Sequence, residues 1–343
     1  MMAAQRPSAV VGLAVRGLVI RPYAGADDVP AWVRIINAEY EADGVEERIS
    51  EEGERAWLAE VSDQFDPSRD VSIAELDGRP VAVATRQWVD LRDGSAREYR
   101  VWGAVDPAFR GRGIGRAVLT DNERLSAELA ASQHLDRPAL LAAFYAEGRP
   151  GGRLMRRAGY DVARWFFDMV RPTLDELPSE LPPLPDGVDL RPATPDQFAA
   201  IWQANREAFR DHWGGSDESE AAMRRFLDSP EMDPALWLIA WDGDEVAGGV
   251  INAIYEAQNE ALGLRRGWLD SVFTRRPWRN RGLARALIAR SLVLLSERGM
   301  TSAALGVDAD NPTGALGLYE RAGFAVHDRF VAWRKPMKLG EVT

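Results

Sequence analysis

Short apolar runs separated by glycine-containing turns recur along the chain, and they predict antiparallel β-hairpins. In the first half these runs flank Asp77-Gly78, and in the second half they flank Asp242-Gly243. An Asp-Gly pair between two β-rich runs favours a tight hairpin turn, because both residues tolerate a positive φ. The expected strands are 71–76, 81–88, 99–105 and 140–144 in the first half and 236–241, 246–254, 268–274 and 302–307 in the second.

Helical spacing of apolar residues marks the segments between these strands. Helices are expected over 29–40 and 195–210, and another follows the strand at 268–274, with apolar residues such as Leu283 and Leu287 four positions apart. A further short helix and a final strand pair are expected near the end of each half. This layout predicts an α/β (α+β) fold, in which a mixed sheet is flanked by helices.

The chain also contains an internal repeat. The segment RGRGIGRA at 110–117 is matched by RNRGLARA at 279–286, with five of the eight positions identical. MRRAGY at 155–160 is matched by YERAGF at 319–324. Matching features in the same order at a nearly constant offset indicate two copies of one domain.

A proline-rich segment separates the two copies. Its prolines are excluded from helix interiors and central strands, so an extended linker is expected over 172–187. The predicted domains are therefore 1–171 and 188–343. The linker prolines are Pro172, Pro178, Pro182, Pro183 and Pro185.

The composition excludes several classes of protein. The 343 residues include 42 Lys and Arg against 53 Asp and Glu, a formal net charge of −11, whereas nucleic-acid-binding proteins are usually basic. There is no cysteine and no long apolar run, and the short apolar stretch 9–15 is interrupted by Arg16, so we expect no disulfide, membrane span or signal peptide. We expect a cytoplasmic monomer or homodimer without nucleic-acid or membrane partners.

Positive charge is nevertheless concentrated in one place. Residues 275–285 contain five arginines and no acidic residue, which points to a small anionic ligand. The segment follows a strand and opens a helix, where free backbone N–H groups and the helix dipole attract anions. The chain has no Gly-x-x-x-x-Gly-Lys segment, which excludes a P-loop, and it lacks the full Gly-x-Gly-x-x-Gly spacing of a dinucleotide-binding loop. A glycine-tightened turn with solvated arginines is the alternative, and the duplication of the loop favours phosphate binding.

Arg-x-x-Gly-x-Gly/Ala between a strand and a helix resembles the pyrophosphate loop of the GNAT superfamily of N-acetyltransferases, and both halves carry it. The resemblance implies a splayed mixed sheet with acetyl-CoA between its two middle strands, and no metal. In the second half it implies cofactor contacts from Val272, Phe273, Thr274, Arg279, Asn280, Arg281, Gly282, Leu283 and Ala284. In the first half it implies a second cofactor site at Val105, Arg110, Gly111, Arg112, Gly113, Ile114 and Gly115.

A second motif separates the two halves. The segment from Asn311 to Phe324 resembles the family segment in which an Asn contacts the cofactor and a Tyr hydroxyl lies beside its sulfur, a role that falls to Tyr319. Asn311 before a proline also suits a helix N-cap, and Tyr319 would also suit a packing aromatic. In the first half Glu147 and Met155 stand at these places, and methionine cannot donate a proton. The first half is therefore a degenerate copy that either holds cofactor or braces the sheet.

Two weaker candidates complete the predicted site. Asp270, on the strand before the second loop, is placed to accept a proton from an ammonium group, or it is a solvated strand residue. His212 follows the helix that walls the acceptor site in the family, although a lone histidine is more often structural. No His-x-x-x-His pair supports a metal site.

These features predict an N-acetyltransferase. Acetyl would pass directly from acetyl-CoA to a primary amine of a small molecule in the second half, where backbone N–H groups at 272–274 polarise the thioester carbonyl. Tyr319 would protonate the thiolate and Asp270 would take the ammonium proton. The alternatives are a non-catalytic acyl-CoA sensor or scaffold and an acyltransferase with another acyl chain or acceptor.

Overall fold

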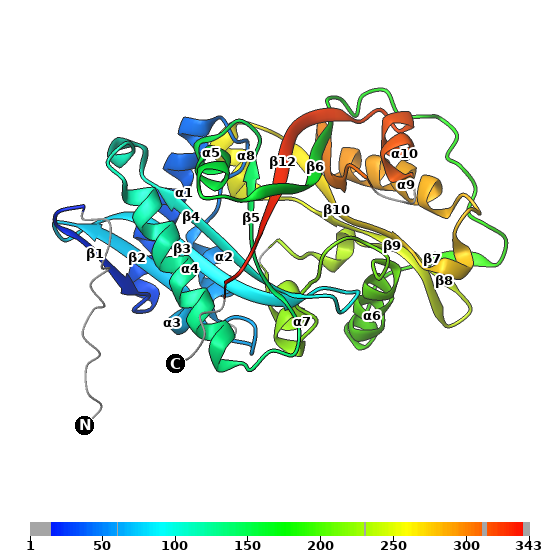
Figure 1. The fold of residues 1–343 in the computed structure, drawn as a ribbon. Coiled ribbons are helices and arrows are strands. Elements are labelled where there is room, and N and C mark those ends of the chain that lie inside the picture. Colours follow the sequence, from blue (N-terminus) through cyan, green and yellow to red (C-terminus); the bar gives the residue numbers. More distant parts are fainter. Residues whose placement is uncertain (1–14, 60, 230, 311–313, 339–343) are drawn as a thin grey trace. The chain divides into compact units, whose positions relative to one another are not determined.

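The computed structural model describes residues 15–59, 61–229, 231–310 and 314–338, and the chain divides into two compact units. Unit 1 consists of Met1–Ala163, Gly214–Ser229 and Val331–Thr343, and unit 2 consists of Arg164–Trp213 and Pro230–Phe330. Within each unit the strands pair in a mixed parallel and antiparallel arrangement, and helices pack on them (Figure 1).

The sheet of unit 1 confirms the strands predicted for the first half. Neighbouring strands are antiparallel from β1 to β4, and β4 and β5 are parallel. The turn between β2 and β3 has positive φ at both Asp77 (51°) and Gly78 (80°), as the Asp-Gly signal predicts. The strands in spatial order are β1 (Leu18–Pro22), β2 (Val71–Leu76), β3 (Arg79–Asp90), β4 (Arg97–Val105) and β5 (Ala139–Ala146).

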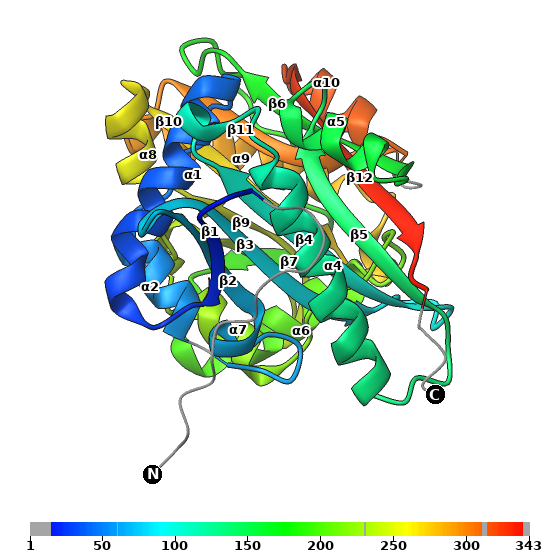
Figure 2. The ribbon, with the colours of Figure 1, turned by 60° about the vertical axis from the view of Figure 1, so that its left-hand side comes forward.

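Helices cover both faces of this sheet, because alternate residues of each strand point to opposite sides. Ile73 and Val83 pack with Trp32 of α1 (Val29–Asp43), whereas their neighbours Ala82 and Ala84 pack with α4 (Ile114–Ser132). Figure 2 shows α4 lying along β3 and β4. The other helices of this part of the chain are α2 (Glu51–Ala59), α3 (Pro67–Asp70) and α5 (Pro150–Arg157).

Unit 2 repeats the arrangement. Its strands are antiparallel from β7 to β10, while β10 and β11 are parallel. Asp242 ends β8 and pairs with Glu245, so the two-residue turn is 243–244, one position later than the predicted Asp242-Gly243 turn. The strands are β7 (Val188–Arg191), β8 (Leu238–Asp242), β9 (Glu245–Ala253), β10 (Arg266–Thr274) and β11 (Ser302–Asp308).

The helices of unit 2 place one apolar core against its sheet. The predicted helix over 195–210 begins with a 3-10 turn at Pro195–Gln197 and continues as α6 (Phe198–Ala208). The core joins α9 residues such as Leu287 to Leu269 on β10. The proline-rich segment 172–187 contains no helix or strand, and its Leu174 is buried in the same core. The remaining helices are α8 (Glu256–Leu262), α9 (Leu283–Glu297) and α10 (Ala315–Arg321).

Each unit also contains a strand from the other half of the chain. Residues 164–171 of β6 (Asp161–Arg171) belong to unit 2, where they pair antiparallel with β11. From Val331 onward, β12 (Ala325–Pro336) belongs to unit 1 and runs beside β5. Helix α7 (Glu220–Leu227) likewise belongs to unit 1. No described helix combines the length and apolar character needed to cross a membrane.

Candidate active site

The middle strands of each sheet separate, as the predicted splayed sheet requires. In unit 2, β10 and β11 pair only from Arg266–Trp268, and the rest of β10 runs on to Thr274 without β11 beside it. In unit 1, β4 and β5 pair only at 97–100. The unpaired edge of each strand leads directly into the glycine–arginine loop. Each unit therefore has main-chain groups facing the gap between its two middle strands.

The backbone of both loops suits an anion. Asn280 (φ 61°) and Gly282 (φ 84°) adopt left-handed conformations, as do Gly111 (77°) and Gly113 (86°). Left-handed residues alternating with their neighbours turn successive N–H groups toward one point. Neither helix that follows has a side-chain cap, so the N–H groups of its first turn stay open to an anion.

The first arginine of the second loop already has several hydrogen-bond partners within the protein. Arg279 bonds the Asp211 carboxylate (3.1 Å), the Ala208 carbonyl (2.9 Å) and the Thr274 carbonyl (3.1 Å). Arg276 pairs with the same carboxylate, and hydrogen bonds from Arg276 and Arg279 lower the pKa of Asp211 to about 2. These bonds fasten the loop to the end of α6.

The loop of unit 1 repeats this arrangement. Arg110 forms a bidentate pair with Asp43 (2.7 and 2.9 Å) at the end of α1. Two further arginines of each loop segment face solvent. None of them has an acidic partner within the described part of the chain. These residues are Arg112 and Arg116 in unit 1 and Arg281 and Arg285 in unit 2.

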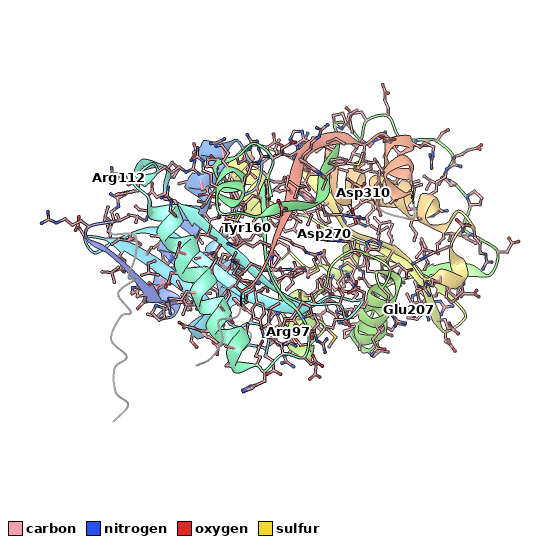
Figure 3. The ribbon with its side chains drawn as sticks, viewed as in Figure 1. Arg97, Arg112, Tyr160, Glu207, Asp270 and Asp310 are labelled. Carbon is pink, nitrogen blue, oxygen red and sulfur yellow. The ribbon has the colours of Figure 1, made fainter. Side chains whose placement is uncertain are left out.

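Asp270 occupies a bulge in β10. The pairing with β9 passes from Leu269 to Ser271 with a register shift, so Asp270 is the extra residue, and a bulge redirects its side chain. The Tyr255 hydroxyl donates a hydrogen bond to its carboxylate (2.7 Å). Asp270, which is labelled in Figure 3, is exposed to solvent. Protein atoms around its carboxylate nevertheless reduce its solvation, and this desolvation raises its pKa to about 6.

Unit 1 has no counterpart of this bulge. Strands β3 and β4 pair without a register shift from 97 to 105. Val101 is the residue of β4 that corresponds to Asp270, because both precede the first arginine of their loop by the same distance. Val101 is buried. The bulge and the carboxylate therefore distinguish unit 2.

Tyr319 lies on α10 with its side chain 7% exposed and its ring edge-on to Phe324, 6.3 Å between centroids. Burial raises the pKa of Tyr319 to about 12, and its hydroxyl has no hydrogen-bond partner among the described residues. Tyr319 shares one packed cluster with Val272 of β10 and with Leu283, the first residue of α9 after the loop. The structure thus brings the predicted acid, strand and loop together. Asn311 lies outside the described residues.

The remaining predicted residues differ in their surroundings. His212 is half-buried with its ring against Phe209 (4.4 Å between centroids), one residue from the Asp211 carboxylate that holds the loop. The Thr274 hydroxyl is buried at the end of β10, and no residue in the described part of the chain hydrogen-bonds it. In unit 1, Met155 lies at the place that corresponds to Tyr319 and is 1% exposed.

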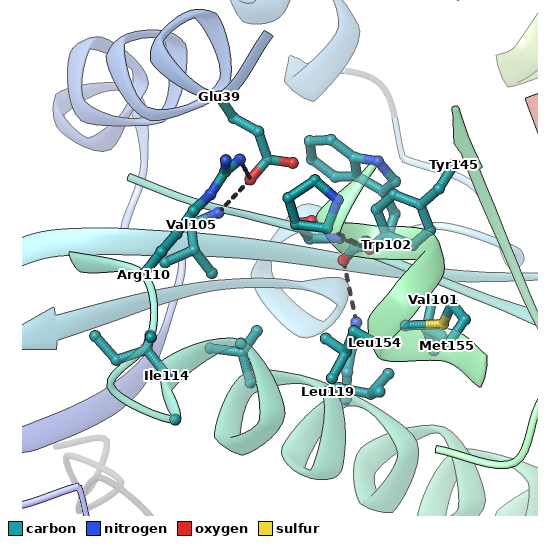
Figure 4. A pocket seen from close by; sticks show the side chains of 18 residues that line it. Glu39, Val101, Trp102, Val105, Arg110, Ile114, Leu119, Tyr145, Leu154 and Met155 are labelled. Carbon is teal, nitrogen blue, oxygen red and sulfur yellow. Dashed lines mark hydrogen bonds and ion pairs between the residues drawn. The ribbon is translucent and has the colours of Figure 1, made fainter. Parts of the chain in front are cut away.

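A cavity of about 190 Å³ lies beside the loop of unit 1 (Figure 4). Its walls include the loop glycines, the unpaired end of β4, Met155 and two side chains that the sequence analysis did not select, Glu39 and Tyr145. Glu39, Tyr145 and Tyr255 do not lie in a recognisable sequence motif, so their positions beside the loops and strands are evident only in the folded structure.

Comparison with known proteins agrees with this geometry. Residues 198–324, which include β10, its loop and Tyr319, match the acetyltransferase (GNAT) family, and the chain belongs to this family of acetyltransferases. The mycothiol acetyltransferase of Geodermatophilus obscurus is 32% identical over 67% of this chain and 72% of its own length. That of Salinispora arenicola is 31% identical over 78% of this chain and 82% of its own length.

Solved structures show the same fold. A GCN5-related N-acetyltransferase from Sphaerobacter thermophilus has a TM-score of 0.67 and 28% identity, covering 94% of this chain and 96% of its own. A tandem GNAT protein from the clavulanic acid biosynthesis pathway has a TM-score of 0.66 at 19% identity, covering 94% of this chain and 99% of its own. The predicted family and fold are confirmed.

Proposed function

We propose that this acetyltransferase moves acetyl from acetyl-CoA to a primary amine of a small molecule, and that the reaction takes place in unit 2. The observation that carries the proposal is the bulge at Asp270, which puts a carboxylate of raised pKa on the strand that leads to the anion loop. Unit 1 lacks both the bulge and a hydroxyl at the place of Tyr319.

The cofactor would lie along the open edge of β10. Arg275 donates its N–H to Ala247 of β9, so by alternation the N–H groups of Val272 and Thr274 face the gap. One of these N–H groups would hydrogen-bond the thioester carbonyl and stabilise the negative charge that develops on its oxygen. The pyrophosphate would bind the loop N–H groups together with Arg281 and Arg285.

The reaction needs a proton transfer at each stage. Asp270 accepts a proton from the ammonium group, and the free amine then attacks the thioester carbon. The C–S bond breaks, and Tyr319 gives its proton to the departing thiolate. The acylated nitrogen then loses its second proton, which leaves a neutral amide and restores the Tyr319 phenol. A phenol with a pKa of about 12 is fully protonated at neutral pH, so it is ready to act as the acid.

Two considerations support a small amine as acceptor. The relatives carry the name mycothiol acetyltransferase, which links them to a small-molecule acceptor. The raised pKa of Asp270 lies close to neutral pH, where a base can both accept and release a proton. Turnover measured with acetyl-CoA and a panel of small amines tests the proposal. Absence of acetyl transfer to every amine, with a folded protein, would overturn it.

Reversing both open arginines of the second loop should weaken acetyl-CoA binding. We expect Arg281→Glu with Arg285→Glu to raise the Kd by tenfold or more, since charge-assisted contacts to phosphate are replaced by repulsion. The matched control is Arg112→Glu with Arg116→Glu in unit 1, which should leave turnover unchanged. Titration calorimetry and steady-state assays measure the two effects, and an unchanged Kd in the first variant contradicts the site. Arg279→Glu is a less direct probe, because it also frees α6 from the loop.

Tyr255 should set the pH dependence of the reaction. Its hydrogen bond stabilises the charged form of Asp270 and so lowers a pKa that desolvation raises. Without that bond the Asp270 pKa rises, so Tyr255→Phe should move the acid limb of kcat/KM to higher pH. A pH profile of both proteins measures the shift. An unmoved limb would mean that Tyr255 has only a packing role against Trp268.

A further inference from the structure

In unit 1 a tyrosine hydroxyl occupies the open edge of β4. The Asp106 N–H bonds Val81 on β3, so by alternation the main-chain groups of Gly103 and Val105 face the gap beside β5. The Tyr145 hydroxyl accepts the Gly103 N–H (3.1 Å) and donates to the Gly103 carbonyl (3.1 Å). The Tyr145 hydroxyl thus occupies both the N–H and the carbonyl of Gly103, which a ligand bound along this edge would need for its own hydrogen bonds.

A carboxylate occupies the next position on the same edge. Glu39 of α1 accepts the Val105 N–H (2.7 Å) and also pairs with Arg110 of the loop (3.3 Å), as Figure 4 shows. Burial raises the pKa of Glu39, and the Val105 N–H and Arg110 oppose that rise. The Glu39 side chain therefore lies between the edge of β4 and the anion loop.

The structure also makes room for the tyrosine ring. The ring packs so closely against Gly151 that a Cβ at that position would collide with it. At the offset that matches Met155 with Tyr319, Gly151 corresponds to Ala315 and Tyr145 to Ala309, so no aromatic ring stands at that place in unit 2. Within the described residues of unit 2, no side chain accepts the N–H of Val272 or Thr274.

We propose that Tyr145 and Glu39 form a cap inside the cavity of unit 1, where they occupy the edge of β4 and block it to the acyl-pantetheine arm of a CoA ester. This inference rests on the proposed function, in which the equivalent edge of β10 binds that arm. A CoA ester entering unit 1 must displace hydrogen bonds that are already made, whereas in unit 2 it meets open N–H groups. The cap, together with Met155, therefore explains how one repeat keeps an anion loop without acting as a second active site.

Removing the cap should create binding rather than abolish it. The experiment starts from the full chain carrying Arg281→Glu and Arg285→Glu, so that binding in unit 2 is weakened and unit 1 is observed. Adding Tyr145→Ala with Glu39→Ala should increase acetyl-CoA affinity at least tenfold in titration calorimetry, since hydrogen bonds of the cap no longer compete. Tyr160→Phe is the matched control, because the Tyr160 hydroxyl bonds Glu123 outside the cavity and its loss should leave affinity unchanged.

Milder variants serve if the double variant does not fold. Tyr145→Phe removes only the hydroxyl, and Gly151→Ala displaces the ring without deleting it; each should give part of the gain, with circular dichroism confirming the fold. Tight acetyl-CoA binding by the loop-reversed chain with native Tyr145, unchanged by the cap variants, would overturn the inference and leave the proposed function standing. No acetyl-CoA binding by the unmodified chain would overturn both.

Discussion

Replacing Tyr319 with phenylalanine should lower kcat about a hundredfold while the Kd for acetyl-CoA stays nearly constant. In the proposed mechanism the hydroxyl would act only as the C–S bond breaks, so its removal would raise the free energy of the transition state and not that of the ground state. The ring, which is 7% exposed, is kept, so packing in the core of unit 2 should survive. The expected loss of kcat lies at the lower end of the range for general acid catalysis, because a thiolate is already a fair leaving group.

Single-turnover acetyl transfer and a thermal unfolding scan check this result together. Phe324→Leu is the control for packing, because it changes the ring that touches Tyr319 and leaves the hydroxyl in place. A wild-type transfer rate in Tyr319→Phe would show that Tyr319 is a packing residue. A similar loss of kcat in both variants would lead to the same conclusion.

The second large effect is expected at Asp270. Asp270→Asn should lower kcat/KM about a hundredfold at neutral pH, because asparagine cannot accept the ammonium proton. In the native protein the carboxylate is protonated below its pKa of about 6, so activity should fall as pH drops through that value. The variant should lose this acid limb.

The pH profile separates catalysis from a simple structural effect. Asp244→Asn, at the exposed turn between β8 and β9, changes a carboxylate in the same unit and should leave rate and profile unchanged. If Asp270→Asn kept the acid limb near pH 6, another group would be the base. If neither rate nor profile changed, Asp270 would be a solvated strand residue.

The repeat and the strand–loop–helix order could be predicted because they depend on local chemistry. Asp77-Gly78 adopts the left-handed turn that its residue types favour, and Gly113 and Gly282 adopt the positive φ that a glycine allows. Tyr319 was selected because the segment from Asn311 to Phe324 resembles a family segment, and the repeat shows Met155 at the matching place in the first half. These signals need no knowledge of distant contacts.

The interactions that were missed join residues far apart in the sequence. Arg279 bonds the Asp211 carboxylate, and no sequence motif marks either residue for that pairing. The bulge at Asp270 is a property of the register between β9 and β10, which hydrophobic alternation does not specify. Tyr145 lies one residue beyond the predicted strand 140–144 and belongs to no motif.

The interleaving of the units has a consequence for synthesis on the ribosome. The neighbour of β5 in unit 1 is the C-terminal part of β12, so the first half of the chain emerges long before its sheet can be completed. Until then β5 presents unpaired backbone groups, which are sites for wrong pairing with other nascent chains. Helix α7, which also belongs to unit 1, emerges only after residues 164–213 of unit 2. Neither unit is a complete product of one half of the gene, so the two must mature together at the end of translation.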